Sequence, residues 1–388
     1  MIHAKDDGAP APTLTLDGRE VTFAPGESLL EVARRHGLEV PTLCHDPRLA
    51  PAGACRSCLV ELEGQRRLVP SCATPAADGQ VVRVSADESE RIARHRRSLY
   101  SLYLTEHADP DDAERGAPNQ LVAQARAAGA EDWGKLTNLR DDLLGDRSKD
   151  ENPYILYDSE LCILCARCTR YCDEVEAVSA ITLADRGSKT TIATSEGRSL
   201  LDTTCELCGG CVAVCPTGAM GEKKPKDRGQ PIEADLEKVR TTCNYCGVGC
   251  QFDLNVDPGG REGRGEVVKV TSPDPSPVSD LHLPGGLTGV TTDGNLCVKG
   301  RFGYDFLHHD ERLTTPLVRG ADGELHPATW EEALDAAAKG LAGVQERHGK
   351  DALAFVSSSR CTVEENYLVQ KLARAVYGTN NVHQCAAT

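Results

Sequence analysis

The sequence predicts an α+β chain of several domains, and two observations support this prediction. The chain has 388 residues, which is long enough for more than one domain. It also contains 18 cysteines, and 16 of them fall into four sets of four, in three different sequence contexts. We therefore expect several small cysteine-rich domains along the chain.

The length and the first residues of the chain indicate whether these cysteines form disulfide bonds or bind metal. Disulfide scaffolds are typical of small secreted domains, whereas this long chain starts with MIHAKDDGAPAP, which has neither an apolar signal region nor a twin arginine. No segment is apolar enough to span a membrane. We therefore expect a cytoplasmic protein with no membrane span, whose cysteines bind metal. The formal net charge of −16 argues against nucleic acid as a partner.

The first cysteine set follows a predicted hairpin and helix. Residues 13–23 alternate apolar and polar side chains around Asp17-Gly18, which predicts a β-hairpin. Residues 28–36 predict a short helix that ends at Gly37. The spacing C-x10-C-x2-C-x13-C then places Cys44, Cys55, Cys58 and Cys72.

This order of elements resembles the β-grasp 2Fe–2S domain of plant-type ferredoxins. Its longer first gap resembles the version at the N-terminus of complex I large subunits, iron-only hydrogenases and formate dehydrogenases. A Rieske site would need two histidine ligands. Four cysteines are already present, so we expect His36 and His45 to be surface residues.

The second and third sets share one spacing, C-x2-C-x2-C-x3-C, which is the bacterial ferredoxin run. The second set is Cys162, Cys165, Cys168 and Cys172, and the third is Cys205, Cys208, Cys211 and Cys215. In such a run three cysteines bind one 4Fe–4S cluster and the fourth reaches the other cluster. We therefore expect Cys215 to join the first three cysteines of the second set, and Cys172 to join the first three of the third.

The two runs favour clusters over zinc, and one of them departs from the usual pattern. Structural zinc sites use separated pairs of ligands, so they fit three cysteines within seven residues less well than a cluster does. Pro216 follows the third set as the pattern requires, but Asp173 follows the second set where proline is usual.

Residues 85–152 contain no cysteine. Ser85 and Glu88 predict a capping box before a helix over residues 91–107. In the families named above this helix is followed by the cluster motif His-x3-Cys-x2-Cys-x5-Cys. Here His107 is followed by Asp111, Glu114 and Gln120, so the resemblance implies that this cluster is missing. We expect a solvated His107 that binds no metal, and a polar, partly helical connector over residues 109–150.

The fourth set combines Cys243, Cys246 and Cys250 with Cys297, which follows after a further 46 residues. Short strands are predicted over residues 239–242, 251–256 and 266–270. Spacing alone leaves a zinc site open. However, TTCNYCGVGCQF, GNLCVKGRFG, RLTTPLVR and WEEALDAAAKGL resemble the beginning of molybdenum- or tungsten-bis-pterin oxidoreductases, whose cysteines there hold a 4Fe–4S cluster. SSSRCTVEENYLVQKLARAVYGTNNV resembles formate dehydrogenase, and it includes a predicted helix over residues 363–377.

The resemblance covers nearly the whole chain, and it is to the N-terminal part of the alpha subunit of cytoplasmic NAD(P)-linked formate dehydrogenases. It implies one 2Fe–2S and three 4Fe–4S clusters, with a molybdenum- or tungsten-bis-pterin guanine dinucleotide in the complete protein. It also implies that Lys299 bridges the last cluster and the pterin. Electrons from formate would pass through the clusters to a flavin- and NAD(P)-binding iron–sulfur subunit, with a small 2Fe–2S subunit as a further candidate partner.

The expected domains are a 2Fe–2S ferredoxin-like domain (1–84), a helical segment and connector without its cluster (85–152), a double 4Fe–4S ferredoxin-like domain (153–228), a 4Fe–4S bis-pterin oxidoreductase domain (236–312) and the beginning of an α/β molybdopterin domain (313–388). Such a chain would hold about 14 iron atoms. Of the remaining cysteines, we expect Cys361 to be small and buried.

Two alternatives stay open at this point. One is a complex I or hydrogenase type electron-transfer subunit without pterin, because such families share the N-terminal modules. The other is a pure relay protein. Molybdenum or tungsten together with pterin in the purified complex would distinguish formate dehydrogenase from both.

The last residues, TNNVHQCAAT, resemble the segment before the metal ligand of formate dehydrogenases. Cys385 matches a cysteine that precedes this ligand by four positions. The resemblance therefore implies cysteine or selenocysteine at position 389. Since UGA encodes selenocysteine and ordinarily stops translation, we expect UGA at that codon, and a chain that is inactive with formate by itself. A split gene is the alternative explanation.

Overall fold

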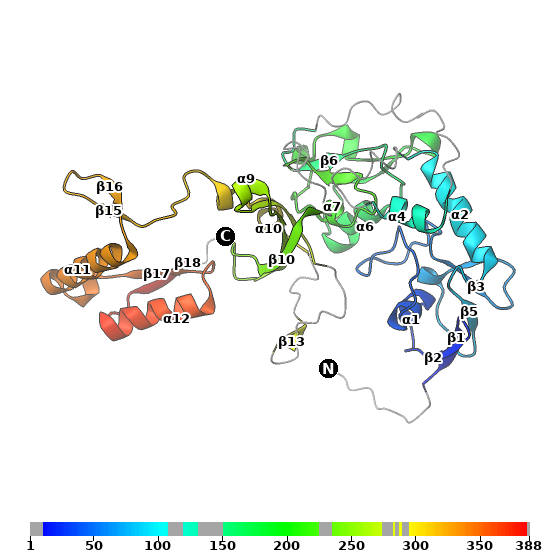
Figure 1. Ribbon diagram of the computed structural model, residues 1–388, viewed down its shortest axis with the longest axis horizontal. Helices are drawn as coiled ribbons and strands as arrows, with labels where there is room; N and C mark the ends of the chain where they lie inside the picture. Colours follow the sequence, from blue (N-terminus) through cyan, green and yellow to red (C-terminus); the bar gives the residue numbers. More distant parts are fainter. Residues whose placement is uncertain are drawn as a thin grey trace. The chain divides into compact units, whose positions relative to one another are not determined.

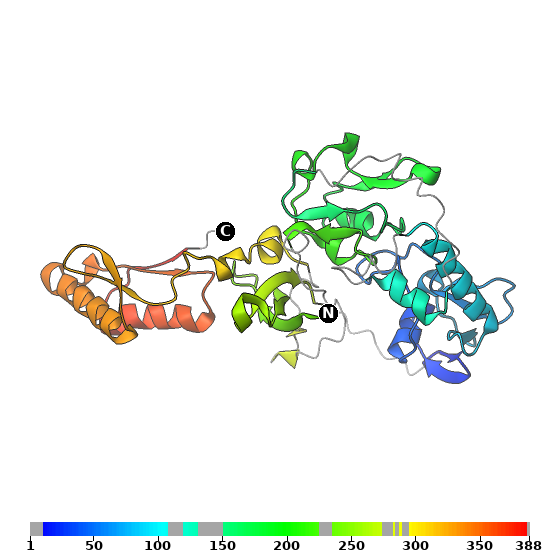
Figure 2. The same cartoon turned by 45° about the horizontal axis from the view of Figure 1, so that its top comes forward.

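The computed structural model describes residues 11–107, 119–130, 150–224, 235–273, 282–283, 287–288 and 295–385. The chain divides into two compact units, Met1–Leu236 and Glu237–Thr388. Figures 1 and 2 show the helices and strands of both units from two directions.

The first unit begins with a five-stranded sheet in the order β2-β1-β5-β3-β4. Its strands are β1 (Thr13–Leu16), β2 (Arg19–Thr22), β3 (Leu59–Leu62), β4 (Val69–Pro70) and β5 (Val81–Arg83). β1 and β5 are parallel, and the other neighbours are antiparallel. The predicted hairpin is present, because Asp17 and Gly18 both adopt a positive φ between β1 and β2.

Helix α1 (Leu29–Arg35) begins at a capping box of Ser28 and Glu31. It ends at Gly37, whose φ of 76° favours glycine. The buried face of α1, including Leu29 and Val32, packs in one core with Leu14, Leu16 and Val82 of the sheet. This helix over a sheet with a parallel central pair is the predicted β-grasp fold.

Helix α2 (Glu90–Leu104) is preceded by a different cap from the one that the sequence predicts. Its N-cap is Ser89, whose side chain accepts a hydrogen bond from the N–H of Ile92. The predicted capping box of Ser85 and Glu88 is wrong, because the Ser85 hydroxyl donates to Asp17 instead (2.8 Å). Helix α4 (Gln120–Ala127) is the described helical part of the predicted connector, and residues 131–149 lie outside the described residues.

The double cysteine run occupies a compact domain of short elements. Two antiparallel pairs form its framework, β6 (Ile155–Tyr157) with β9 (Met220–Glu222) and β7 (Thr182–Ala184) with β8 (Thr191–Ala193). The helical elements of the first unit not yet named are η1 (Ser71–Ala73), α6 (Arg167–Arg170), η3 (Tyr171–Val175), η4 (Gly187–Lys189), η5 (Ser195–Gly197), η6 (Leu200–Asp202) and α7 (Gly210–Ala213).

The second unit begins with an antiparallel sheet in the order β10-β11-β12. The strands β10 (Glu237–Thr242), β11 (Gln251–Asp257) and β12 (Glu266–Thr271) confirm the three short strands expected here. The small elements around them are α9 (Gly260–Gly263), β13 (His282–Leu283), β14 (Leu287–Thr288), α10 (Val298–Phe302) and η9 (Asp305–His308).

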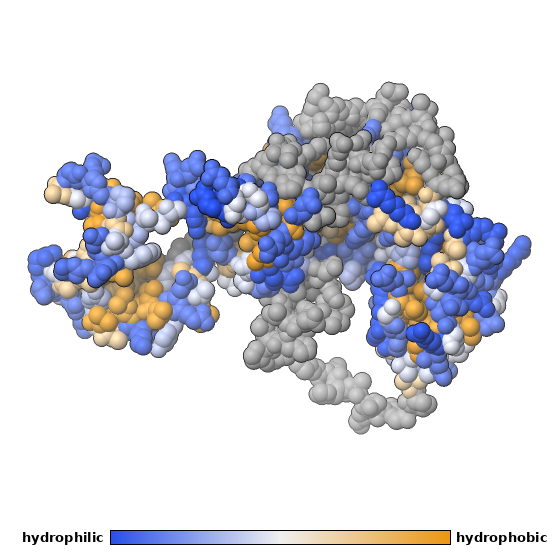
Figure 3. All heavy atoms as spheres, viewed as in Figure 1, coloured by the Kyte–Doolittle hydropathy of each residue, from blue (hydrophilic) through white to orange (hydrophobic). Residues whose placement is uncertain are grey.

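The rest of this unit contains the hairpin β15 (Leu317–Arg319) and β16 (Leu325–Pro327), helix α11 (Trp330–His348), η10 (Lys350–Ala352), and the parallel pair β17 (Phe355–Ser358) and β18 (Val382–Cys385). Helix α12 (Val363–Lys371) continues as η11 (Leu372–Val376), which confirms the helix expected over residues 363–377. Figure 3 shows an apolar surface over α12. Val363 and Leu368 of this helix and Val376 of η11 are exposed.

Candidate metal centres

The four cysteines of the first set are all buried beside the β-grasp core. Cys44, Cys55 and Cys58 lie on the loop between α1 and β3, and Cys72 lies on η1. They are arranged as two pairs. The sulfurs of Cys58 and Cys72 are 3.4 Å apart, and the thiols of Cys44 and Cys55 hydrogen-bond to each other. Two close sulfur pairs fit a two-iron cluster in which each iron binds two cysteines.

The two thiols of each pair differ in acidity. The hydrogen bond with Cys44 lowers the pKa of Cys55 to about 5, and the hydrogen bond with Cys72 lowers the pKa of Cys58 to about 7. The same bonds, together with burial, raise the pKa of Cys44 and Cys72. Since iron binds thiolates, both thiols of each pair must lose their protons when metal binds.

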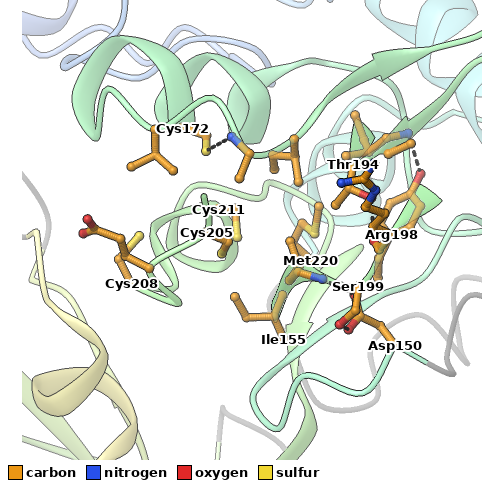
Figure 4. A pocket seen from close by; sticks show the side chains of 18 of the residues that line it. Asp150, Ile155, Cys172, Thr194, Arg198, Ser199, Cys205, Cys208, Cys211 and Met220 are labelled. Atoms are coloured by element: carbon orange, nitrogen blue, oxygen red, sulfur yellow. Dashed lines mark hydrogen bonds between the residues drawn. The ribbon is translucent and has the colours of Figure 1, made fainter. Parts of the chain in front are cut away.

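The second and third sets cross over in space as their spacing predicts. A small cavity is lined by the first three cysteines of the second set and by Cys215. A larger cavity of about 570 Å³ is lined by the first three cysteines of the third set and by Cys172. Figure 4 shows the cysteines at one end of this larger cavity, with Asp150, Thr194, Arg198 and Ser199 at the other end. Each cavity therefore gathers the four sulfurs that one 4Fe–4S cluster needs.

Backbone N–H groups point at these sulfurs, which is a feature that suits anionic, metal-bound thiolates. The donor–sulfur distances are 3.3–3.4 Å. The pairs are Leu164 to Cys162, Ala180 to Cys172, Leu207 to Cys205, Gly210 to Cys208 and Met220 to Cys215.

The segment that bears Cys168 and Cys172 holds the loop that bears Cys44. Arg170 donates hydrogen bonds to the carbonyls of Cys44 and Ala50, and the N–H of Ala50 donates to Glu174 (2.7 Å). These contacts join segments more than 115 residues apart in the sequence. They therefore hold the first set and the second set in a defined spatial relation.

A buried ion network lies beside these contacts. Asp46 accepts from Arg48 at 2.9 Å and from Arg167 at 3.3 Å. Burial opposes ionisation of Asp46, but these arginines outweigh it and lower its pKa to about 2. Arg48 also stacks over the ring of Tyr171, with its guanidinium carbon 5.0 Å from the ring centroid.

Apolar packing also joins the first and second sets. One cluster of side chains includes Cys44, Cys55 and Tyr100, and Tyr103 and Cys165 pack against it. The Tyr103 hydroxyl donates to the carbonyl of Cys55 (3.3 Å). Burial raises the pKa of Tyr103, and the nearby Cys55, Cys165 and Cys44 raise it further.

His107 lies just after α2 but is buried, so the expectation of a solvated histidine is wrong. Its Nε2 is 3.3 Å from the side-chain amide nitrogen of Asn119, the N-cap of α4. Gln120 receives a long hydrogen bond from Arg167 (3.4 Å). Asp111 and Glu114 lie outside the described residues. Of the two other histidines considered, His36 is exposed as expected, whereas His45 is half-buried.

The fourth set lies around the β10–β11 connection and the start of α10. The N–H of Cys243 donates to the carbonyl of Cys250 (2.8 Å). Burial raises the pKa of the Cys243 thiol, and Cys250, Cys297 and Cys246 raise it further. Cys243 is buried and Cys297 is exposed. Lys299 is an exposed residue of α10, two positions after Cys297.

The start of the last domain contacts this fourth set. The guanidinium of Arg360, which follows β17, lies 4.9 Å from the ring centroid of Tyr245, between Cys243 and Cys246. Cys361, expected to be buried, is exposed. In the part of the chain that the structure describes, no three His, Cys, Asp or Glu side chains share the position of a single metal ion.

Four residues that support the cysteine sites were not identified from the sequence. Arg170 and Thr217 each stand two residues after a cysteine of the ferredoxin runs, Cys168 and Cys215, and this nearness is the signal that could have revealed them. Asp46 likewise stands two residues after Cys44 and two before its partner Arg48, whereas its pairing with Arg167 and the place of Tyr157 in the small cavity depend on the fold. Within the described ranges, no helix is both long and apolar enough to cross a membrane.

Models of known protein families match the segments of this chain that contain the four cysteine sets. Residues 11–87 match a 2Fe–2S iron–sulfur cluster binding domain, and residues 152–221 match the ferredoxin-like domain of NADH-quinone oxidoreductase subunit 3. Residues 236–309 match the Fe4S4 domain of molybdopterin oxidoreductases, and residues 312–388 match molybdopterin oxidoreductase itself. The chain thus contains, in this order, segments similar to a 2Fe–2S domain, a ferredoxin-like domain, an Fe4S4 domain and the molybdopterin oxidoreductase domain. The predicted fold class is thereby confirmed.

Curated relatives of this chain are longer proteins. The alpha subunit of a Geobacter sulfurreducens NADPH-Fe(3+) oxidoreductase is 35% identical over 95% of this chain and 40% of its own length. A subunit of NADH-quinone oxidoreductase from Rhizobium meliloti is 37% identical over 95% of this chain and 39% of its own length. A Staphylococcus aureus protein named "Putative formate dehydrogenase SAUSA300_2258" is 30% identical over 96% and 39%.

The chain thus spans about 40% of the length of these relatives. Among solved structures, a chain of an NAD+-reducing [NiFe]-hydrogenase in the H2-reduced state matches with 30% identity and a TM-score of 0.48. This match covers 55% of the present chain and 88% of the hydrogenase chain.

Proposed function

We propose that the chain is an electron-transfer protein whose 16 grouped cysteines bind one 2Fe–2S and three 4Fe–4S clusters. The observation that supports this most is the crossed arrangement, in which each of two cavities is lined by three cysteines of one run and the fourth of the other. The N–H groups aimed at the sulfurs fit the negative charge that such clusters gain on reduction. The first set, with its two sulfur pairs, would hold the 2Fe–2S cluster.

We further propose that the chain is the N-terminal part of a formate dehydrogenase catalytic subunit. The molybdopterin match of residues 312–388 and the name of the Staphylococcus aureus relative support this assignment. The complete protein would bind a molybdenum- or tungsten-bis-pterin guanine dinucleotide, which supplies the two-electron chemistry on formate. The apolar surface over α12 suits a face that further protein covers.

Lys299 is the residue of this chain that we assign to the passage between the pterin and the fourth cluster. It stands on α10, two residues after the fourth cysteine of that set. Its positive charge would stabilise the electron received by the cluster. Arg360 over Tyr245 would hold the beginning of the molybdopterin domain against the same cysteine loop.

The names of two relatives support the partners that we propose for this chain. The relatives from Geobacter sulfurreducens and Rhizobium meliloti are named as subunits of NADPH- and NADH-linked oxidoreductases. We infer a cytoplasmic complex in which a flavin- and NAD(P)-binding iron–sulfur subunit exchanges electrons with the 2Fe–2S domain. A small 2Fe–2S subunit is a further candidate partner.

The second candidate function is an NADH-linked relay subunit that works without pterin. The 37% identity with the Rhizobium meliloti NADH-quinone oxidoreductase subunit favours it, because that similarity extends over the molybdopterin region as well.

Metal, pterin and formate assays of the purified native complex separate these two functions. For formate dehydrogenase we expect molybdenum or tungsten, pterin, and formate-dependent reduction of a dye. Replacement of Lys299 by glutamine should slow formate-dependent reduction of the clusters while dithionite still reduces them. Lys189→Gln, at an exposed lysine of η4, is the matched control. A complex that contains iron only and reduces dye with NADH but not formate would contradict the formate assignment.

A further inference from the structure

Two hydroxyl groups line the small cavity that also contains Cys162, Cys165, Cys168 and Cys215. They belong to Thr217, two residues after Cys215, and to Tyr157, the last residue of β6. The Thr217 hydroxyl oxygen is 3.7 Å from the sulfur of Cys215, which is within hydrogen-bond range for sulfur. Thr217 is only 1% exposed, so water has little access to replace this contact.

The Tyr157 hydroxyl approaches the same cavity from another element. Strand β6 places Tyr157 opposite Met220 of β9, whose N–H donates to the sulfur of Cys215. The Tyr157 side chain hydrogen-bonds to that of Cys162. The Ile192 N–H donates to the Tyr157 oxygen (3.4 Å), and the Thr191 hydroxyl lies 3.2 Å away. The Tyr157 oxygen therefore contacts two adjacent residues of β8 in addition to Cys162.

The direction of both hydrogen bonds is fixed once the cysteines bind iron. An iron-bound cysteine is a thiolate with no proton to donate, so within each of these two hydrogen bonds the hydroxyl is the donor and the sulfur is the acceptor. A donor at a ligand sulfur spreads the negative charge of the cluster. The reduced cluster has one more negative charge than the oxidised cluster, so it benefits more from the donor and its reduction potential rises.

We propose that Thr217 and Tyr157 raise the reduction potential of the 4Fe–4S cluster bound by Cys162, Cys165, Cys168 and Cys215. This rests on the proposed function, since it needs these four cysteines to share one cluster. Neither hydroxyl binds iron, and both act through a ligand sulfur. With these two hydroxyl groups, the cluster accepts an electron more readily than the same cluster would without them.

The test is a redox titration, followed by electron paramagnetic resonance, of the native complex and of Thr217→Val, Thr217→Ser and Tyr157→Phe variants. The signal of this cluster is the one that Cys168→Ser removes. We expect Thr217→Val and Tyr157→Phe each to lower the midpoint potential, with a change in the reduction equilibrium of about threefold to tenfold, where tenfold is 59 mV for one electron. Thr217→Ser keeps the hydroxyl and should restore the original potential.

Thr182→Val, at an exposed threonine of β7, is the matched control and should leave the potential unchanged. If the cluster loads fully and neither Thr217→Val nor Tyr157→Phe shifts its potential more than the control does, the tuning proposal is overturned. If Thr217→Val fails to load the cluster, Tyr157→Phe decides by the same criterion. Absence of the Cys168-dependent signal from the unaltered complex would instead refute the proposed cluster assignment.

Discussion

The two ferredoxin runs have the same backbone conformation but different surroundings. Leu164 and Leu207, each two residues after the first cysteine of its run, adopt φ values of 55° and 53°. Two residues later, Ala166 and Gly209 adopt 60° and 72°. Bulky residues rarely adopt a positive φ, and such strain is concentrated at functional sites. The shared spacing therefore specifies one local structure twice.

The surroundings differ at equivalent positions. Two residues after the second cysteine, the first run has Arg167, which pairs with buried Asp46. The second run has Gly210 there, because the ring of Tyr171 occupies the space of a side chain. Cysteine spacing thus determines which sulfurs meet, and long-range packing makes each site individual.

The largest effect should come from the two cysteines on the α6–η3 segment. Although Cys168 and Cys172 are only four residues apart, they line different cavities. We expect Cys168→Ser and Cys172→Ser to abolish or convert different 4Fe–4S clusters, each with a loss of up to about 4 iron atoms. Iron analysis and electron paramagnetic resonance of both variants measure this, with Cys361→Ser as the control. Loss of the same signal in both variants would contradict the crossed arrangement.

Asp46→Asn tests the feature that belongs to the first run. It leaves Arg48 and Arg167 without their buried carboxylate, so we expect a loss of about 3 kcal/mol in the free energy of unfolding. Guanidinium unfolding followed by cluster absorbance measures it. The control Asp335→Asn removes an exposed pair with Lys339 and should cost less than about 1 kcal/mol. Equal effects in the two variants would show that the buried network adds nothing.

Gly210→Ala tests the counterpart in the second run. Its Cβ would lie 1.9 Å from Cε1 of Tyr171, so the ring must move, at a cost of about 1–3 kcal/mol. Gly340→Ala is the matched control, because nothing lies within 4 Å of its Cβ on α11; we expect it to be neutral or to stabilise by up to about 1 kcal/mol. The same unfolding measurement applies, and a neutral Gly210→Ala would mean that Tyr171 does not need this space.

The smallest effect should come from exchanging the residue types at the left-handed positions. Gly209→Ala introduces a Cβ at positive φ and should cost about 1 kcal/mol, whereas Ala166→Gly should relieve strain of similar size. Thermal unfolding of the two variants should therefore shift in opposite directions. Shifts in the same direction would show that packing, and not backbone strain, dominates at these positions.

Local signals in the sequence predicted the local structure well. The hairpin at Asp17-Gly18 and the helix that begins at Ser28 depend on neighbouring residues, and both are present. The N-cap of α2 was wrong because Ser85 finds a partner 68 positions away, in Asp17, that no local pattern reveals.

The cysteine groupings were also predictable, since three members of each ferredoxin run lie within seven residues. Their supporting residues were not. Arg170 reaches the Cys44 carbonyl from 126 positions away, and the burial of His107 depends on packing against the segment that begins at Asn119. Such contacts are set by how the domains fold onto one another, which spacing does not encode.

Iron-57 Mössbauer spectroscopy with iron quantification, on anaerobically loaded protein, tests the central claim most directly. That claim is that the four cysteine sets hold one 2Fe–2S and three 4Fe–4S clusters, and that His107 holds none. The account predicts about 14 iron atoms per copy of this chain, divided between these two cluster types in a ratio of about one to six. About 18 iron atoms, or zinc in place of iron in any of the four sets, would contradict it.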